Sequence, residues 1–182
     1  MPHLGSWKAD TYFLHRIIDC IEQMKPAQVV ELGSGASSLV IAKALDMHGG
    51  GRLASYDQNP DFIAQMPAWL AEHGLAAEFH HAPLTSRDPR WPGLWYDLAH
   101  APARIDLLVI DGPPWTVHPF VRGMAERLFD RIAPGGMILL DDAARPGERV
   151  VERRWRRDWP DFTFNYEGGG TAGTLVGRRA TG

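Results

Sequence analysis

The sequence predicts an α/β fold built around a doubly wound, mostly parallel sheet. Short apolar runs alternate along the chain with segments whose apolar residues recur at helical spacing. The run at residues 105–110 is almost continuously apolar, as is typical of a central parallel strand buried on both faces. Near the C-terminus two apolar runs flank a glycine-rich stretch, which indicates an antiparallel hairpin. This order of elements is expected to place helices on both faces of the sheet.

The first predicted element is a helix from about Ala9 to Met24, because Phe13, Ile17 and Ile21 fall on one helical face before Lys25-Pro26 ends it. The other helices are expected at residues 37–47, 60–74, 118–132 and 147–159. Seven strands are predicted, at residues 27–32, 52–56, 76–82, 105–110, 137–140, 162–167 and 174–178. Pro134-Gly135-Gly136 is interpreted as the turn into the fifth of them.

Residues 83–104 form the one long connection of this pattern. An unstructured loop of that length would be unusual, so the segment is expected to be either functional or partly helical. It contains Trp91, Trp95 and Tyr96. These rings either stack on a ligand or form the hydrophobic contact that attaches the segment to the domain.

Composition favours one domain over residues 1–182, with residues 1–26 as a helical addition to a core at 27–182. Of the 182 residues 45% are hydrophobic, enough for a sizeable core. The net charge of −3 gives no general attraction to nucleic acid or to anionic membranes. A single cysteine, Cys20, excludes an intrachain disulfide framework and a multi-cysteine zinc site. No run approaches the roughly 18 apolar residues of a membrane helix, and a cytoplasmic location is expected.

The stretch from Val29 to Ser38, Val-Val-Glu-Leu-Gly-Ser-Gly-Ala-Ser-Ser, carries the most functional information. An apolar run leads through two glycines into a helical pattern, which predicts a strand that turns into a helix through a loop with small side chains. A ligand can approach such a backbone closely, near the positive end of the helix dipole. Asp57 ends the next predicted strand, where a carboxylate can accept two ribose hydroxyls. The pattern therefore indicates a cofactor that contains a nucleoside.

Two kinds of nucleoside site share this pattern. A nicotinamide dinucleotide site prefers a third small residue for close helix packing, where this chain has Ser38. Such an enzyme also usually needs a second half-sheet or a substrate domain, for which the chain leaves no room.

The order of segments resembles the class I S-adenosylmethionine-dependent methyltransferases, and most closely a branch of small bacterial O-methyltransferase-like proteins with a Rossmann-like fold. The residues that carry the resemblance are Glu31-Leu-Gly-Ser-Gly-Ala-Ser, Asp57, Asp106-Leu-Leu-Val-Ile-Asp111-Gly-Pro, Pro134-Gly-Gly-Met-Ile-Leu-Leu-Asp141-Asp142 and the closing hairpin. Some relatives in that branch bind magnesium. The resemblance covers nearly the whole chain.

The resemblance implies a set of cofactor contacts. Gly33 and Gly35 would approach the methionine part, and Glu31 would hold its amino group directly or through water. Asp57 would bind the ribose. The full set of expected cofactor residues is Glu31, Gly33, Ser34, Gly35, Asp57, Gln58 and Asp111. Many relatives place an acidic residue after the third strand for the adenine amino group. Here that position reads Ala82-Pro83, so adenine would meet backbone groups or aromatic rings instead.

Three carboxylates follow the fourth and fifth predicted strands. If these strands are neighbours, Asp111, Asp141 and Asp142 meet at the carboxyl edge of the sheet, where their repulsion would favour a bound cation. Mg²⁺ prefers oxygen ligands and would orient and acidify an acceptor hydroxyl. The catechol-type methyltransferases use this arrangement, and the three aspartates match their metal positions in chain order. Alternatively, Asp111 orders the following turn, and Asp141 or Asp142 caps the next helix.

His118 and Arg122 are expected one helical turn apart beside the same crevice. If no metal is bound, His118 is the first candidate for a general base, with Asp111 as the other catalytic candidate, and Arg122 could grip an anionic or sugar substrate. Alternatively, both belong to a polar helix face. The basic run at residues 149–157 is interleaved with acidic residues and is interpreted as a solvated helix face, so no nucleic-acid partner is expected.

The function predicted from the sequence is methyl transfer from S-adenosylmethionine to a small-molecule acceptor, with a hydroxyl oxygen as the favoured acceptor atom and Mg²⁺ as an optional second cofactor. A partner subunit, such as a second copy of the chain, could complete the acceptor pocket. One rival is a same-fold enzyme that uses another nucleoside cofactor such as NAD. The other is a binding module for S-adenosylmethionine that has lost its chemistry.

Overall fold

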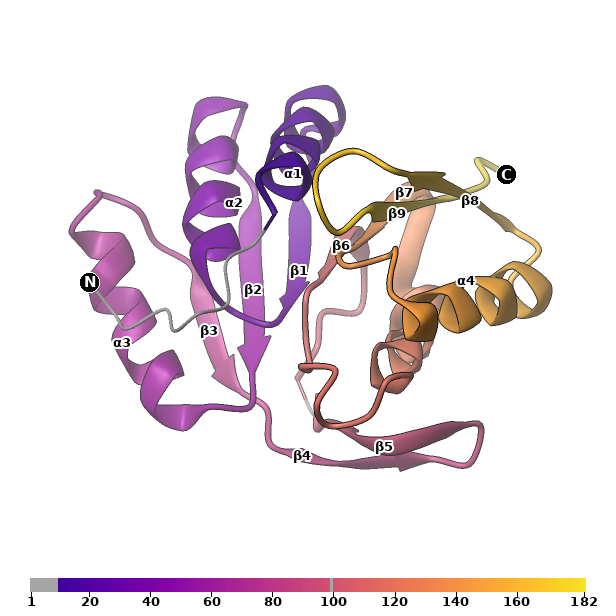
Figure 1. The fold of residues 1–182 in the computed structure, drawn as a ribbon. Helices are drawn as coiled ribbons and strands as arrows, with labels where there is room; N and C mark the ends of the chain where they lie inside the picture. The colour runs from indigo at the N-terminus through magenta and orange to yellow at the C-terminus, as the bar shows by residue number, and fades with distance from the viewer. Residues whose placement is uncertain (1–9, 99) are drawn as a thin grey trace.

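The computed structural model describes residues 10–98 and 100–182 and contains a seven-stranded sheet with the order β3-β2-β1-β6-β7-β9-β8 (Figure 1). The strands of this sheet are β1 (Gln28–Leu32), β2 (Arg52–Asp57), β3 (Glu78–His81), β6 (Ile105–Ile110), β7 (Ile132–Leu140), β8 (Phe162–Glu167) and β9 (Thr174–Arg179). The first five are parallel, and β9 runs antiparallel to both β7 and β8. The predicted fold class, a mostly parallel sheet with a C-terminal antiparallel hairpin, is confirmed.

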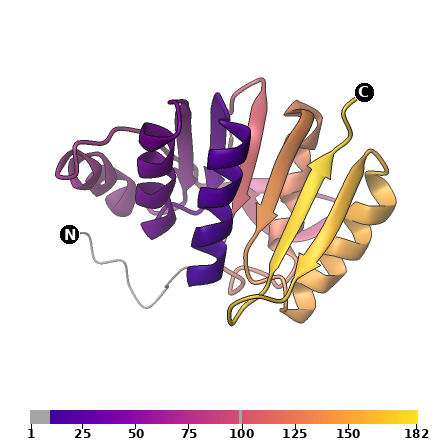
Figure 2. The same cartoon turned by 90° about the horizontal axis from the view of Figure 1, so that it is seen from above.

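The helices cover the two faces of the sheet in two groups (Figures 1 and 2). They are α1 (Thr11–Met24), α2 (Ala36–Met47), α3 (Pro60–Ala71), η1 (Val121–Arg131) and α4 (Pro146–Asp158). Successive side chains of a strand point to opposite faces. Val29 accordingly packs with α1, α2 and α3, whereas Val30 packs in the core formed with η1 and α4. Because both faces are covered, the central strands are almost wholly apolar.

The connection at residues 83–104 contains a second, two-stranded antiparallel sheet instead of a helix. Its strands are β4 (Leu84–Asp88) and β5 (Trp91–Tyr96). Of the two alternatives for this segment, functional or partly helical, the second is therefore wrong for its described residues. Trp91 and Trp95 are buried in the core on the η1 side of the sheet, and burial of these large rings holds the hairpin against the domain.

The segment predicted as a helix at 118–132 is shorter and forms a 3₁₀ helix, η1, from Val121 to Arg131. It is wedged between the β4–β5 hairpin and α4, and six consecutive residues from Val121 to Glu126 are buried. Burial of six consecutive residues means that η1 is enclosed on more than one side. Strand β7 also begins earlier than expected, at Ile132, and the residues around Gly135, where φ is +76°, form a bulge before pairing with β6 resumes at Met137.

Helix α1 begins at Thr11, since the side chain of Asp10 accepts a hydrogen bond from the Tyr12 nitrogen at 2.8 Å and caps the helix. The predicted start at Ala9 lies outside the described residues. Among the helices of the described chain, none has the length and apolar composition to cross a membrane.

Candidate active site

The turn between β1 and α2 brings two glycines to the carboxyl edge of the sheet. Gly33 adopts φ = +95°, and a Cβ at this position would lie 2.8 Å from the backbone nitrogen of Gly112. Gly35 precedes α2, and its nitrogen donates a hydrogen bond to the Ser38 hydroxyl at 3.0 Å. Only glycine fits at the first position, while the second leaves open space in front of its backbone. The loop thus presents bare backbone beside a helix N-terminus.

A cavity of about 460 Å³ opens in front of this loop. Six of the seven predicted cofactor residues line it: Gly33, Ser34, Gly35, Asp57, Gln58 and Asp111. Its volume lies within the range of pockets that hold small molecules and cofactors, roughly 300–1,000 Å³. The site also lies where doubly wound sheets bind ligands, beyond the carboxyl ends of the parallel strands.

Glu31, the seventh predicted cofactor residue, is buried behind the loop and does not line the cavity. Its Oε2 accepts hydrogen bonds from the hydroxyls of Ser38 and Ser55, both at 2.5 Å, whereas its Oε1 is buried with no partner among the described residues. Burial raises the pKa of Glu31 to about 7, although the serine hydroxyls that bond to it act in the opposite direction. A cation bound nearby would satisfy the orphaned oxygen and lower this pKa.

Asp57 ends β2, both orders the following turn and lines the cavity, and its predicted ribose contact stays a prediction. Its Oδ1 accepts a hydrogen bond from the Asn59 nitrogen at 2.8 Å, which orders the turn into α3, and the residue also lines the cavity. Burial raises the pKa of Asp57. Beside it, the Oε1 of Gln58 accepts a hydrogen bond from the Tyr96 hydroxyl at 3.2 Å. Tyr96 therefore joins the end of the hairpin to the cavity wall.

All three aromatic residues of the long connection are buried in the core, as one of the two predicted functions requires. Trp91 and Trp95 belong to the core and do not line the cavity, whereas Tyr96 does. Further cavity residues come from other segments and were not predicted from the sequence: Asp10, Asn59, Phe62, Pro114, Thr171 and Ala172. The first and last of these lie far apart in the chain, and no local pattern marks them as neighbours.

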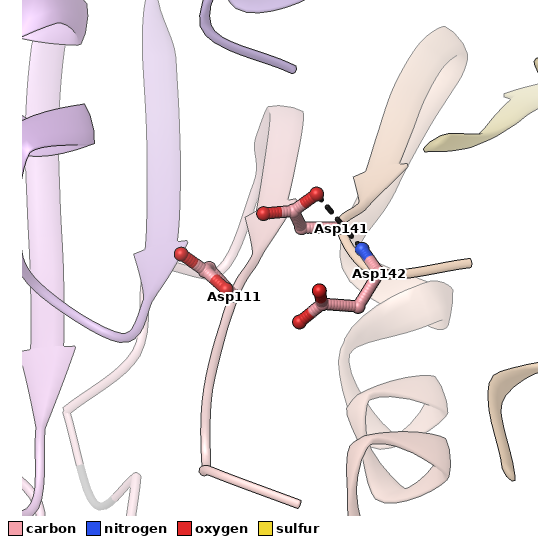
Figure 3. Close-up of side chains that lie close together, drawn as sticks. All are labelled: Asp111, Asp141 and Asp142. Carbon is pink, nitrogen blue, oxygen red and sulfur yellow. Dashed lines mark hydrogen bonds between the residues drawn. The ribbon is translucent and has the colours of Figure 1, made fainter. Parts of the chain in front are cut away.

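Asp111, Asp141 and Asp142 meet at the ends of β6 and β7, as predicted, and one carboxylate oxygen from each lies within 4.8 Å of the others (Figure 3). Asp141 Oδ1 accepts a hydrogen bond from the Asp142 nitrogen at 2.8 Å. Burial, together with repulsion among the carboxylates, raises the pKa of Asp111 to about 6 and that of Asp141 to about 8. Helix α4 begins instead after Arg145, with no side-chain cap, so neither Asp141 nor Asp142 caps it.

A buried guanidinium lies among these carboxylates. Arg122 of η1 is 3% exposed and contacts Asp111 Oδ1 at 3.2 Å and Asp142 Oδ2 at 3.1 Å. The partly exposed Arg145 also reaches Asp142 Oδ2, at 2.7 Å, and Glu148 Oε1 lies 3.9 Å from the Nε of Arg122. The sequence placed Arg122 beside the crevice but gave no sign that it would be internal to the acidic cluster.

His118, the other catalytic candidate from the sequence, does not line the cavity. Its Nδ1 accepts a hydrogen bond from the Phe120 nitrogen at 3.1 Å, and its Cβ faces Gly93 of the hairpin. The structure thus places Arg122 at the cavity and His118 outside it, because η1 is not the regular α-helix that the one-turn spacing assumed.

Comparison with known proteins agrees with this architecture. The model of a family described as a methyltransferase domain matches residues 30–143. An O-methyltransferase from Bacillus cereus, determined in complex with SAH, is similar in structure with a TM-score of 0.70 at 15% identity, over 97% of this chain and 84% of that one. No curated protein sequence matches the chain.

Two further solved structures are similar in fold. The O-methyltransferase TomG from Streptomyces achromogenes, involved in tomaymycin synthesis and determined in complex with SAM, has a TM-score of 0.67 at 18% identity over 99% of this chain and 83% of its own. A ribosomal protein L11 methylase from Lactobacillus delbrueckii subsp. bulgaricus has a TM-score of 0.66 at 15% identity, over 94% and 78%. At these identities the likeness concerns the fold.

Proposed function

This chain belongs to the methyltransferase domain family, and from that membership we propose that it transfers a methyl group from S-adenosylmethionine to a hydroxyl oxygen of a small molecule. The observation that carries the proposal is that one cavity gathers the glycine loop, Asp57 and Asp111. A sulfonium cofactor offers an ammonium, two ribose hydroxyls and a transferable methyl group, and the residues around this cavity suit each of them.

The residues fit S-adenosylmethionine in chemical terms. The unpartnered Oε1 of Glu31 is a buried acceptor suited to an ammonium, held directly or through the hydroxyls that surround it. Asp57 offers carboxylate oxygens to the ribose. Gly33 and Gly35 remove the side chains that would separate the ligand from the backbone. Tyr96 and Phe62 provide aromatic surface in the same cavity for the adenine.

The protein has two tasks in this reaction: it positions the acceptor oxygen against the methyl group, and it accepts one proton. The acceptor oxygen forms a bond to the methyl carbon as the carbon–sulfur bond breaks, the sulfur keeps the electron pair, and the hydroxyl proton leaves to a base. We assign this base to Asp111, which lines the cavity at the end of β6. Burial raises the pKa of Asp111, which makes its carboxylate a stronger base than that of a solvent-exposed aspartate. His118 lies outside the cavity lining and has no part in this assignment.

Calorimetric titration of S-adenosylhomocysteine into the purified protein tests the cofactor assignment. We expect micromolar binding to the wild type, at least tenfold weaker binding to Asp57→Ala, and no change in Asp46→Asn, a control on the exposed Asp46 of α2. NAD should not bind. Absence of S-adenosylhomocysteine binding, or equal binding to Asp57→Ala, would refute the proposal, and binding of NAD instead would identify the rival cofactor.

Turnover separates an enzyme from a binding module. Conversion of S-adenosylmethionine to S-adenosylhomocysteine is followed with a panel of small phenols and alcohols. Asp111→Asn should keep S-adenosylhomocysteine binding but lose most of the turnover. If the protein binds the cofactor but methylates no acceptor in the panel, the binding-module alternative gains support over the enzyme.

A further inference from the structure

The guanidinium of Arg122 has all five of its N–H donors engaged within the protein. Nε–H donates to the Pro113 carbonyl oxygen at 3.2 Å. The Nη1 group donates to the Asp141 carbonyl oxygen at 3.2 Å and to Asp142 Oδ2 at 3.1 Å. The Nη2 group donates to the carbonyl oxygen and the Oδ1 of Asp111, at 2.6 and 3.2 Å. A planar five-donor group satisfied in this way is locked in place.

These contacts join the ends of two strands that carry the acidic cluster. Asp111 follows β6, and Asp141 and Asp142 follow β7, so a single side chain from η1 bonds to both strand ends. In Figure 3 the three carboxylates converge from these two strand ends. Asp142 adopts φ = +59°, a conformation that is uncommon outside glycine. Its carboxylate forms ion pairs with both Arg122 and Arg145.

A divalent cation does not fit this arrangement. Mg²⁺ requires oxygen lone pairs directed at it from about 2.0–2.1 Å in near-octahedral geometry. One oxygen of each aspartate already has a partner in the protein. Asp111 Oδ1 accepts a hydrogen bond from Arg122, and Asp142 Oδ2 pairs with both Arg122 and Arg145. Asp141 Oδ1 accepts a hydrogen bond from a backbone N–H. A doubly charged ion placed among the remaining oxygens would also be repelled by two guanidinium groups close by, one of them buried, where screening is weakest.

We propose that Arg122 is the resident cation of the acidic cluster and occupies the role that a divalent metal would otherwise have, so that Asp111, Asp141 and Asp142 hold no metal ion. Arg122 is then a positioning residue, which fixes Asp111 at the cavity wall. A corollary, which rests on the proposed function, concerns the acceptor. Without a metal to chelate, the acceptor needs one hydroxyl and not the two neighbouring oxygens of a catechol.

Manganese binding tests the proposal without any need for activity. Mn²⁺ is titrated into the full chain and followed by electron paramagnetic resonance, with S-adenosylhomocysteine binding measured separately on the same samples. The wild type should bind no Mn²⁺ at micromolar concentrations. Arg122→Gln, which removes the charge, should bind Mn²⁺ at least about tenfold more tightly than the wild type, and Arg122→Gln/Asp142→Asn should lose that gain. If Arg122 had a purely structural role, its replacement by glutamine would not create a metal site.

Two results would overturn the proposal. One is micromolar Mn²⁺ binding by the wild type that disappears in Asp142→Asn. The other is a folded Arg122→Gln that binds no better than the wild type. If Arg122→Gln does not fold, Arg145→Gln serves, since it removes only the partly exposed second cation. It should still bind no Mn²⁺, and binding there would also overturn the proposal. Loss of S-adenosylhomocysteine binding alone would count against the proposed function and not against this inference.

Discussion

Gly33 and Gly112 pack backbone against backbone where β1 and β6 end: a Cβ on Gly33 would lie 2.8 Å from the Gly112 nitrogen. We expect Gly33→Ala to lower the free energy of unfolding by about 1–3 kcal/mol, because it combines this clash with φ = +95°. Gly35→Ala should fold with nearly unchanged stability, since its Cβ meets no atom within 4 Å. Urea denaturation measures both variants.

The same pair of variants tests how close the cofactor comes. Gly35 lines the cavity, so Gly35→Ala places a methyl group where the ligand is proposed to lie. S-adenosylhomocysteine should bind Gly35→Ala at least tenfold more weakly although the protein is stable. Unchanged affinity in this stable variant would mean that the ligand does not lie against the loop backbone.

Glu31 is expected to make stability depend on pH in a specific direction. Its pKa rises from 4.5 to about 7 on folding, because burial disfavours the charged carboxylate. The folded state therefore binds the proton more tightly, and the stabilisation present below pH 4.5 is lost as the pH rises through about 7. This loss amounts to on the order of 3 kcal/mol of unfolding free energy, and it should be absent in Glu31→Gln, whose amide does not ionise. The difference between wild-type and Glu31→Gln unfolding curves at pH 5 and 8 isolates this residue from the other buried carboxylates.

Cofactor binding should show the opposite trend with pH. An ammonium bound near Glu31 favours the carboxylate, so wild-type affinity for S-adenosylhomocysteine should increase as the pH rises from 6 towards the pKa of about 7. Affinity of Glu31→Gln should be weaker and should lack this component of the increase. Parallel pH profiles for the two proteins would remove Glu31 from the binding site.

Asp10 ties the start of α1 to the glycine-rich connection between β8 and β9. Its Oδ2 accepts hydrogen bonds from the Thr171 hydroxyl at 2.7 Å and from the Ala172 nitrogen at 3.1 Å, and both residues line the cavity. Asp10→Ala should lower stability by about 1 kcal/mol through the lost helix cap and speed amide hydrogen exchange at residues 171–172. Thr171→Val, which keeps the helix cap, should retain the stability and lose only part of the protection.

Acid should weaken this contact in the wild type. The Thr171 hydroxyl and nearby backbone N–H groups lower the pKa of Asp10, so its contribution is present above about pH 4 and is lost as the pH falls through the lower folded value. Exchange protection at Ala172 that stays constant through acid titration, until the protein unfolds globally, would contradict this assignment.

Trp91 holds the β4–β5 hairpin to the domain. Its indole N–H donates to Glu126 Oε1 at 3.0 Å, and the guanidinium of Arg154 lies 4.7 Å from its ring centroid. Trp91→Ala should cost about 3–5 kcal/mol of unfolding free energy. Trp115 is 46% exposed, so Trp115→Ala provides a matched control with a change within about 0.5 kcal/mol. Equal losses in the two variants would show that burial of Trp91 is not what anchors the hairpin.

Periodicity and glycine chemistry predicted most of the sheet because those signals are local. The apolar run ending at Ile110 and the loop from Gly33 to Gly35 each carry their own evidence in adjacent residues. To predict that Asp111 meets Asp141, one must also assume that their two strands are neighbours. The structure confirms both the pairing and the contact.

What the sequence did not predict depends on contacts between distant segments. The position of Arg122 inside the acidic cluster follows from the 3₁₀ geometry of η1, which a helical pattern does not distinguish from a regular helix. From the sequence, tryptophans in a long connection could either contact a ligand or pack in the core. For Trp91 the burial seen in the structure shows that it packs in the core. The contribution of Asp10 to the cavity requires the β8–β9 connection to meet α1, which no short-range signal records.

The direction of β9 determines where a label can be attached without blocking the cavity. Because β9 runs opposite to β7, the chain leaves the sheet at the edge away from the cavity, and Thr181 lies near Gly135 at the start of β7. Asp10, by contrast, lines the cavity itself. A fluorophore attached at Thr181 would thus leave the mouth of the site clear, whereas one attached at Asp10 would stand at its entrance.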